Sequence, residues 1–361
     1  MSTSIKQKHI PNLTPIRFFL ALLVVIYHIP QFSNNRGFPF FNDLAIFHKG
    51  REAVYMFFAL SGFLIIKQLF IEKKKTGTVN LKGFYIRRIL RIFPLYYLIL
   101  IIGFLYYQLI LPHLGFDFEN NYDLITGIFL SVCFLPNVFA TFSPGGILEI
   151  LWSIGIEEQF YLLIAPLFLL LPVKRVVFFL GVFTTFYFLV FFSEQFIFFR
   201  KYDMLYYYFS FSGICAILWN KKHIQRTITI MRLPILVLFI LYFVSDIFSK
   251  NLNDIIYHAF SVLLFGFTIA VLAVKPIRFL ENKVMNYLGK ISYGIYMYHA
   301  IAMQSVGFLF LKLLPKFKIN NALTIITINV LVIGITITVS HFSYQYFEKY
   351  FLKMKRKTRN N

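Results

Sequence analysis

The sequence predicts an all-α polytopic membrane protein with about ten transmembrane helices and one additional re-entrant or interfacial segment. Hydrophobic residues make up 58% of the 361 residues, charged residues make up only 14%, and the mean hydropathy is +0.70. A soluble domain is about one quarter charged. Apolar runs of about 18 or more residues recur along the whole chain. The membrane region itself must therefore carry the function, because no stretch is left for a soluble catalytic domain.

The apolar runs define ten predicted spans. We expect the first span to be retained, because no small-residue cleavage site follows it. The predicted spans are residues 14–33, 53–71, 89–111, 152–172, 176–193, 203–219, 233–249, 255–274, 290–311 and 322–346. A further apolar stretch, residues 124–142, is interrupted by Pro136 and Asn137 and is the additional segment.

The basic residues predict the topology. The formal net charge is +21, but the bases lie between apolar spans, where they set orientation, so nucleic acid is not a predicted partner. If residues 124–142 do not cross, 27 of the 36 Lys and Arg lie on one side with Lys6 and Lys8, and 9 lie on the other. If they do cross, this bias collapses. We therefore predict both termini in the cytoplasm and residues 124–142 on the outer face, after an acidic stretch at 114–123. This segment is a candidate for lining a cavity, where non-helical backbone is tolerated at membrane depth.

The domain organisation is predicted to be simple. The sequence indicates one transmembrane domain over residues 10–348 and a basic cytoplasmic tail over residues 349–361. Cys133 and Cys215 both lie in apolar runs and have no metal-ligand spacing, so we interpret them as packing residues and predict no metal site.

The first span carries two ionisable groups, Arg17 and His28, separated by ten uncharged residues. Eleven residues at about 100° each fall roughly 20° short of three full turns, so both side chains project from one helix face. They lie roughly 16 Å apart along the axis, about half of the hydrocarbon thickness. Arg17 is either an interfacial anchor or a functional cation, and His28 is either a hydrogen-bonded core histidine or a proton-transfer group. Histidine is well matched to proton transfer near neutral pH.

The next two spans carry a small-residue pair and a basic cluster. Ser61 and Gly62 lie mid-span in FFALSGFLI, where a small pair more often means close helix packing. The stretch FYIRRILRIFPLYYL places Arg88 and Arg91 three residues apart near a helix N-terminus. This cluster is either a positive-inside anchor or a site for a phosphorylated cytoplasmic ligand, because arginine forks match phosphate oxygens.

Two later spans carry carboxylates and a second histidine. Glu157 and Glu158 lie within two turns of the outer end of the fourth span and point about 100° apart, so at least one should face a polar interior. His299 lies near mid-membrane, nine residues after Lys290. His299 has either a structural role, as a hydrogen-bonded side chain, or a functional role, and the sequence does not decide between them.

Together, the stretches IRFFLALLVVIYH, FFALSGFLI, RRILRIFPLYYL, WSIGIEEQFYLL and LGKISYGIYMYH resemble the acyltransferase-3 family of bacterial membrane O-acyltransferases. The resemblance covers residues 10 to 348. It implies a ten-helix core that takes an acyl group, usually acetyl, from cytoplasmic acyl-CoA and delivers it to a glycan hydroxyl on the other side. Some relatives add a C-terminal extracytoplasmic esterase-like domain, whereas this sequence ends in a short basic tail.

The resemblance also implies roles for individual residues. Arg17 and His28 match the essential pair of the family, and Arg88 and Arg91 match its Arg-x2-Arg motif, thought to hold the donor. Glu158, with Glu157 beside it, falls in the acidic motif. We therefore predict a catalytic set and a donor-binding set. The catalytic set is His28, Glu158 and Glu157, and the donor-binding set is Arg17, Arg88, Arg91 and Ser61.

These observations predict an O-acetyltransferase of cell-surface or exported carbohydrate. His28 would act as general base on the acceptor hydroxyl or carry the acetyl group itself. The predicted partners are acetyl-CoA or another acyl-CoA as donor substrate, a carbohydrate acceptor and the lipid bilayer of a bacterial inner membrane; a homo-oligomer is left open. The alternatives are an acyltransferase acting on a small molecule or lipid headgroup, and a proton-coupled transporter without acyl chemistry. The discontinuous half-helices of inverted-repeat transporters are not evident.

Overall fold

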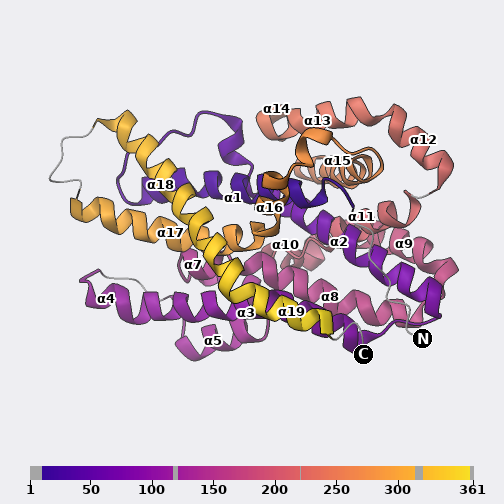
Figure 1. Ribbon diagram of the computed structural model, residues 1–361, viewed down its shortest axis with the longest axis horizontal. Helices are drawn as coiled ribbons and strands as arrows, with labels where there is room; N and C mark the ends of the chain where they lie inside the picture. Colours follow the sequence, from indigo (N-terminus) through magenta and orange to yellow (C-terminus); the bar gives the residue numbers. More distant parts are fainter. Residues whose placement is uncertain (1–9, 117–120, 220, 314–319, 358–361) are drawn as a thin grey trace. The chain divides into compact units, whose positions relative to one another are not determined.

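The computed structural model describes residues 10–116, 121–219, 221–313 and 320–357, and these residues contain helices and no strand (Figure 1). Lys6, Lys8, part of the acidic stretch at 114–123 and the end of the basic tail lie outside the described residues. The α-helices are α1 (Leu13–Asn35), α2 (Gly50–Thr76), α3 (Leu81–Leu105), α4 (Leu111–His113), α5 (Leu124–Val132), α6 (Pro136–Phe139), α7 (Gly146–Glu149), α8 (Trp152–Leu170), α9 (Val176–Phe192), α10 (Ile197–Lys201), α11 (Tyr206–Leu218), α12 (Lys222–Ile230), α13 (Arg232–Val244), α14 (Ile247–Asn251), α15 (Asp254–Val274), α16 (Lys283–Lys290), α17 (Ser292–Leu313), α18 (Asn321–Phe342) and α19 (Lys349–Lys357).

Eight helical stretches of the described chain are long and apolar enough to cross a membrane, or nine if the bent pair α12 and α13 forms one span. These stretches comprise α1, α2, α3 continued to His113, α7 with α8, α9 with its preceding turn, α15, α17, and α18 continued to Met354. The axes of α12 and α13 meet at 58°. The predicted fold class, an all-α polytopic membrane protein, is confirmed.

The interrupted stretch at residues 124–142 does not form one membrane-crossing helix. It forms α5, α6 and a short 3-10 turn at Ala140–Phe142. The nine residues of α5 extend about 14 Å, half of the roughly 30 Å that a span requires. Phe134 adopts a left-handed backbone conformation at the break, with φ of 57°. These features agree with the predicted re-entrant or interfacial segment.

The chain divides into two compact units. The first comprises the described residues of Asn80–Leu162 and Tyr293–Asn361, and the second comprises those of Lys8–Val79 and Leu163–Ser292. The division falls inside α8, whose first eleven residues belong to the first unit. One domain over residues 10–348 stays a prediction.

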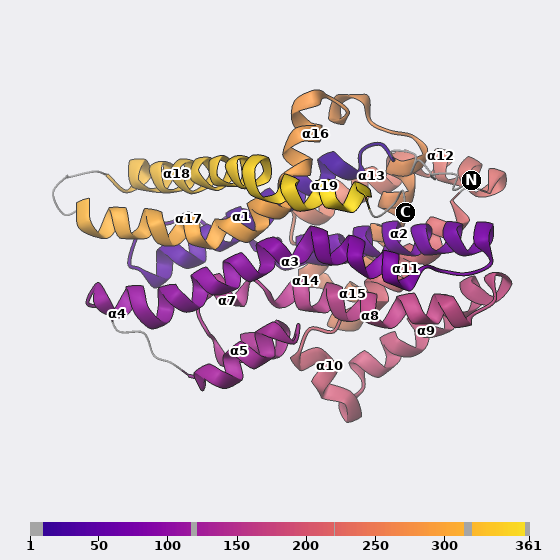
Figure 2. The ribbon, with the colours of Figure 1, turned by 60° about the horizontal axis from the view of Figure 1, so that its bottom comes forward.

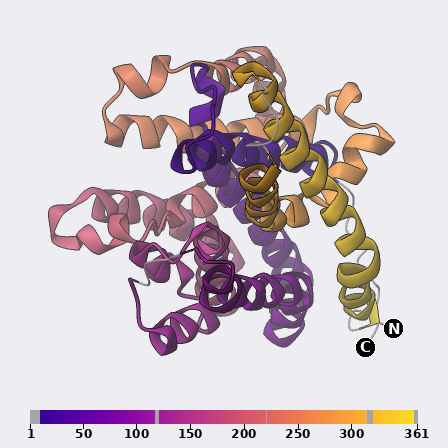
Figure 3. The same cartoon turned by 90° about the vertical axis from the view of Figure 1, so that its left-hand side faces the viewer.

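In the first unit, α17 packs on the C-terminal helical run. Residues Asn321 to Lys357 are helical without a break, because a π-helical turn at Ser343–Glu348 joins α18 to α19, as Figures 1 and 3 show in gold and yellow. The Tyr298 hydroxyl donates a hydrogen bond to Ser343 Oγ over 3.0 Å. A β-carbon on Gly294 would lie 3.1 Å from the Ser340 β-carbon. The small residue therefore lets the two helices approach closely.

In the second unit, α2 and α11 run parallel and side by side (Figure 2). At one end, Arg51 donates to Asp203 Oδ1 over 2.6 Å; at the other end, the Lys67 ammonium lies 4.3 Å from the centre of the Trp219 ring. Between these ends, a β-carbon on Gly62 would overlap the backbone of Phe209.

Arg51 pairs with Asp203 and Lys67 with Trp219, so the segment from Asp203 to Trp219 covers the same length as α2 from Arg51 to Lys67. Sixteen helical rises of 1.5 Å make this length about 24 Å. The prediction placed a span at 203–219, and the regular helix α11 has only 13 residues. It begins late because Asp203, with φ of 51°, forms a left-handed turn. Asp tolerates that conformation better than most residues.

Candidate functional site

The α1 helix of the second unit carries Arg17 and His28 on one unbroken helix. Both side chains are half-buried. The His28 Nδ1 atom lies 3.2 Å from Gln31 Oε1. An amide oxygen only accepts, so Nδ1 carries the hydrogen and, in the neutral ring, Nε2 carries the lone pair. This assignment follows from the hydrogen-bond partner. The arrangement gives α1 an oriented imidazole suited to accepting a proton.

Ser61 and Gly62 lie on the face of α2 that packs against α11. Ser61 is 9% exposed, and Gly62 touches the backbone of Phe209. The neighbouring Ser212 hydroxyl donates to the Ala59 carbonyl oxygen over 2.6 Å, which adds a hydrogen bond between the two helices. Close packing accounts for the glycine, and a role for Ser61 in donor binding stays a prediction.

The basic cluster of the first unit lies on the first turns of α3. Asn80 caps this helix by accepting a hydrogen bond from the Gly83 amide over 2.8 Å. The half-buried Arg88 guanidinium lies 5.7 Å from the centre of the Tyr161 ring and 5.9 Å from that of Phe84. The side chain of Arg91, one turn later, is exposed. One arginine is therefore held against aromatic rings, and the other is accessible to a ligand.

Glu157 and Glu158 occupy different environments on α8. The half-buried Glu157 carboxylate accepts a hydrogen bond from the Tyr161 hydroxyl. Glu158 is only 7% exposed, and its Oε1 atom has no hydrogen-bond partner within the described part of the chain. Both carboxylates lie within electrostatic range of Arg88. This favourable charge offsets part of the cost of burying a carboxylate.

Sequence reasoning missed the tyrosines of α17 that pack beside these groups. The Tyr296 hydroxyl lies 2.7 Å from Ser153 Oγ and donates to the Ile150 carbonyl oxygen over 2.8 Å. His299 is fully buried, and its Nδ1 donates to the Tyr296 carbonyl oxygen over 2.5 Å. Tyr293, Tyr296 and His299 recur every three residues, a spacing that puts them on adjoining parts of one helix face. This three-residue spacing is the feature of the sequence that would have indicated that the tyrosines belong with His299.

The interrupted segment is fastened to the turn of α8 that bears the glutamates. The Gln159 side-chain amide donates to the Phe134 carbonyl oxygen and to Asn137 Oδ1, over 2.8 Å in each case. A β-carbon on Gly155 would lie 2.6 Å from the Pro136 ring, so only glycine allows this approach. Residues 134–137 therefore pack against the part of α8 between Gly155 and Gln159.

The predicted site residues fall into two sets. Arg88, Arg91, Glu157 and Glu158 lie together in the first unit, while Arg17, His28 and Ser61 lie in the second. Their assignment to catalysis and donor binding stays a prediction.

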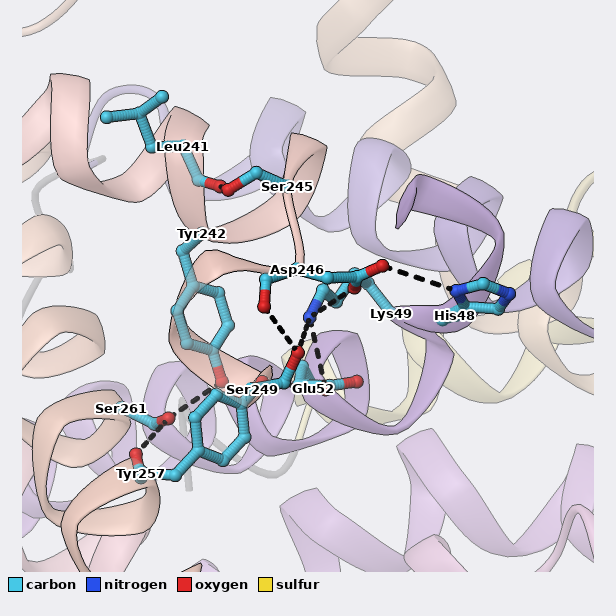
Figure 4. Close-up of polar contacts among 10 residues, drawn as sticks. All are labelled: His48, Lys49, Glu52, Leu241, Tyr242, Ser245, Asp246, Ser249, Tyr257 and Ser261. Carbon is cyan, nitrogen blue, oxygen red and sulfur yellow. Dashed lines mark hydrogen bonds and ion pairs between the residues drawn. The ribbon is translucent and has the colours of Figure 1, made fainter. Parts of the chain in front are cut away.

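A second group of charges, absent from the predictions, surrounds Lys49 in the second unit (Figure 4). Lys49 is 2% exposed, and its Nζ atom lies 3.4 Å from Asp246 and 3.9 Å from Glu52. The rings of Tyr242 and Tyr257 lie 5.7 and 5.9 Å from the same nitrogen. The sequence contains one signal for this cluster, which is that its charged residues lie just beyond the apolar runs. The sequence does not indicate that Lys49 pairs with Asp246, almost 200 positions away.

A family model described as "Acyltransferase domain" matches residues 10–342. The chain therefore belongs to this acyltransferase family, the acyltransferase-3 family that its motifs predict. It is a multi-pass membrane protein, and the predicted enzyme class, an O-acyltransferase, is confirmed.

Three relatives illustrate the similarity. A protein of Acidianus two-tailed virus, ORF330, provisionally named an acetyltransferase, is 27% identical over 84% of this chain and 87% of its own length. The peptidoglycan O-acetyltransferase OatA of Listeria monocytogenes is 32% identical over 48% of this chain and 26% of its own length. SACOL0978 of Staphylococcus aureus, provisionally named an O-acetyltransferase, is 26% identical over 96% of this chain. The chain spans about 58% of that staphylococcal protein. No solved structure matches the chain.

Proposed function

We propose that this chain transfers an acetyl group from acyl-CoA to a hydroxyl group of a cell-surface or exported carbohydrate. The family supports acyl transfer, and the names of the Listeria and Staphylococcus relatives support O-acetyl transfer. The name of the Listeria protein specifies peptidoglycan, which supports a carbohydrate acceptor. We place the enzyme in a bacterial cytoplasmic membrane with both termini in the cytoplasm.

The observation that carries the chemistry is the oriented imidazole of His28. With the hydrogen on Nδ1 donated to Gln31, the Nε2 lone pair accepts the proton of the acceptor hydroxyl. The hydroxyl oxygen then attacks the thioester carbonyl, and the carbon–sulfur bond breaks. The imidazolium returns its proton to the leaving thiolate of coenzyme A. The step uses no oxidant or metal and leaves the histidine unchanged.

The donor is recognised by its phosphates. Coenzyme A is strongly anionic, and Arg91 presents an exposed guanidinium beside Arg88 near the N-terminus of α3. The rings of Phe84 and Tyr161 hold Arg88 in place, which reduces the side-chain entropy lost when a ligand binds. A role for Arg17, near the N-terminus of α1 in the second unit, in donor binding stays a prediction.

Calorimetric titration of the purified protein with acetyl-CoA tests the donor site. Loss of one arginine–phosphate contact costs about 1.5–3 kcal/mol, so Arg88→Ala and Arg91→Ala should each weaken binding roughly ten- to hundred-fold. Arg91→Lys should recover only part of the affinity, because an ammonium does not form the bidentate fork. The matched control is Lys82→Ala, which removes an exposed cation from the same helix. Unchanged affinity in both alanine variants would leave the cluster only a topology anchor.

The catalytic proposal is tested in vesicles with acetyl-labelled acetyl-CoA and a glycan acceptor. His28→Ala should abolish labelling of the glycan while membrane insertion is retained. His28→Gln should also be inactive, because an amide has no basic nitrogen. Labelled glycan at the parent rate in either variant would overturn the general-base role. Label recovered on lipid or on a small molecule alone would overturn the carbohydrate acceptor.

A further inference from the structure

One end of the second unit carries five charged residues that form ion pairs, and we call it the ion-pair end. Its residues are Lys49, Arg51, Glu52, Asp203 and Asp246. Arg51 pairs with Asp203 over 2.6 Å, and both side chains remain accessible, at 52% and 31% exposure. Lys49, in contrast, is buried between Asp246 and Glu52 (Figure 4). The end therefore combines a buried, structural ion pair with an accessible one.

The ion-pair end adjoins the part of α1 that carries His28. A β-carbon on Gly50 would overlap the ring of Tyr27, so this ring packs directly on the chain between Lys49 and Arg51. Tyr27 in turn contacts His28, with ring centres 4.9 Å apart. The Arg51 guanidinium also lies within electrostatic range of Tyr27 and Tyr55. The accessible pair is thus linked to the proposed base through a single intervening aromatic side chain.

The charge around this end is balanced. The segments 36–52, 194–203 and 246–254 together contain six Lys and Arg and six Asp and Glu, whereas the whole chain has a formal charge of +21. A carboxylate or phosphate brought here would meet Asp203 and Glu52 and would find Arg51 and Lys49 already paired. A sugar hydroxyl both donates and accepts hydrogen bonds. Arg51 offers donors and Asp203 offers acceptors, which suits an uncharged polyhydroxyl group.

We propose that the ion-pair end binds the acceptor, that Arg51 and Asp203 contact it, and that the acceptor is uncharged around the reacting hydroxyl. This inference rests on the proposed O-acetyl transfer and specifies its second substrate. It assigns Lys49 and its ion-pair partners to supporting the first turn of α2, which presents Arg51. It also predicts that negatively charged saccharides are poor acceptors.

The test uses the full chain in vesicles with labelled acetyl-CoA and two matched acceptors, maltohexaose and maltohexaose carrying a carboxymethyl group on every glucose unit. We expect kcat/KM to be at least about tenfold higher for the neutral acceptor. The loss of a hydrogen bond to a charged group lowers the binding affinity roughly ten- to hundred-fold. Arg51→Gln and Asp203→Asn should therefore raise the KM for maltohexaose by about that factor and leave the KM for acetyl-CoA unchanged. An unchanged donor KM also shows that the variants are folded.

Two further variants sharpen the result. Arg51→Lys keeps the charge pair without the planar fork and should give an intermediate KM for maltohexaose. Arg200→Gln removes another ion pair, Arg200 with Glu194 at 3.1 Å, from the connector that also contains Asp203, and should change neither KM. Equal or better use of the carboxylated acceptor, or an unchanged maltohexaose KM in both Arg51→Gln and Asp203→Asn, would overturn the inference while O-acetyl transfer stands. Label on neither saccharide would overturn the carbohydrate acceptor and this inference with it.

Discussion

Replacing Lys49 by methionine should destabilise the protein severely. At an effective dielectric constant of about 20, unit charges 3.4 and 3.9 Å apart attract by about 5 and about 4 kcal/mol. Desolvation of Lys49, which is 2% exposed, offsets most of that gain, so the intact cluster contributes little net stability. Removing the cation alone is different, because Glu52 and Asp246 then lose the ammonium that lies between them. We expect a loss of about 3–5 kcal/mol in the free energy of unfolding.

The measurement is unfolding by denaturant in detergent micelles, followed by tryptophan fluorescence, with the free energy obtained by linear extrapolation. Two variants separate charge from volume. Lys49→Met with Asp246→Asn and Glu52→Gln removes all three charges and should recover most of the lost stability. Arg200→Met breaks the pair with Glu194, whose side chain is 82% exposed, and should cost less than about 1 kcal/mol. A Lys49→Met protein within about 1 kcal/mol of the parent would refute the reasoning.

Three further outcomes are expected. In a cysteine-free background, single cysteines at the exposed positions Thr78 and Asn121 should react with an impermeant reagent from opposite sides of the membrane; reaction from one side would contradict the predicted topology. Asp123 caps α5, and hydrogen bonds from Thr126 lower the pKa of its carboxyl below the ordinary 3.8. The ionised carboxylate should therefore stabilise α5 fully above about pH 4, and this stabilisation should be lost as the pH falls through the lowered pKa. Asp123→Ala should speed amide exchange in α5 at pH 7, while Asp123→Asn should not. Gln159→Leu should speed exchange around Asn137 and cost about 1–3 kcal/mol, because buried acceptors lose their donor; parental exchange rates would show that Gln159 does not fasten the segment.

The parts of the fold that sequence predicts are those set by local composition. Residues 14–33 and 255–274 nearly coincide with α1 and α15, because a span must be apolar over the hydrocarbon thickness. The break between α5 and α6 was also predictable, since proline removes a backbone donor and ends a helix. These signals require no knowledge of distant residues.

The parts that sequence did not predict depend on long-range contacts. The span expected at 233–249 ends as a helix at Val244, and Ser245 is extended with φ of −138°. The chain turns there and brings Asp246 to Lys49, a contact between residues almost 200 positions apart. Periodicity does not report such a pairing. The same limit applies in part to the two glutamates of α8. Helix geometry predicts that at least one faces inward, but the burial of Glu158 depends on its neighbours on other helices.

The charges of this chain are used in two different ways, and the difference bears on how an acyltransferase separates its two substrates. Arg87, Arg88 and Arg91 lie within five residues that contain no acid, which favours a polyanionic donor such as coenzyme A. At the ion-pair end, the basic side chains of Lys49 and Arg51 are paired with carboxylates, so that end has little attraction for the same donor. Under the proposed assignment, a neutral acceptor would bind there without competition from acyl-CoA. The two substrates would then be directed to different sites by whether the cations of each site are paired with carboxylates. This distinction does not depend on the net charge of the chain, which is strongly basic.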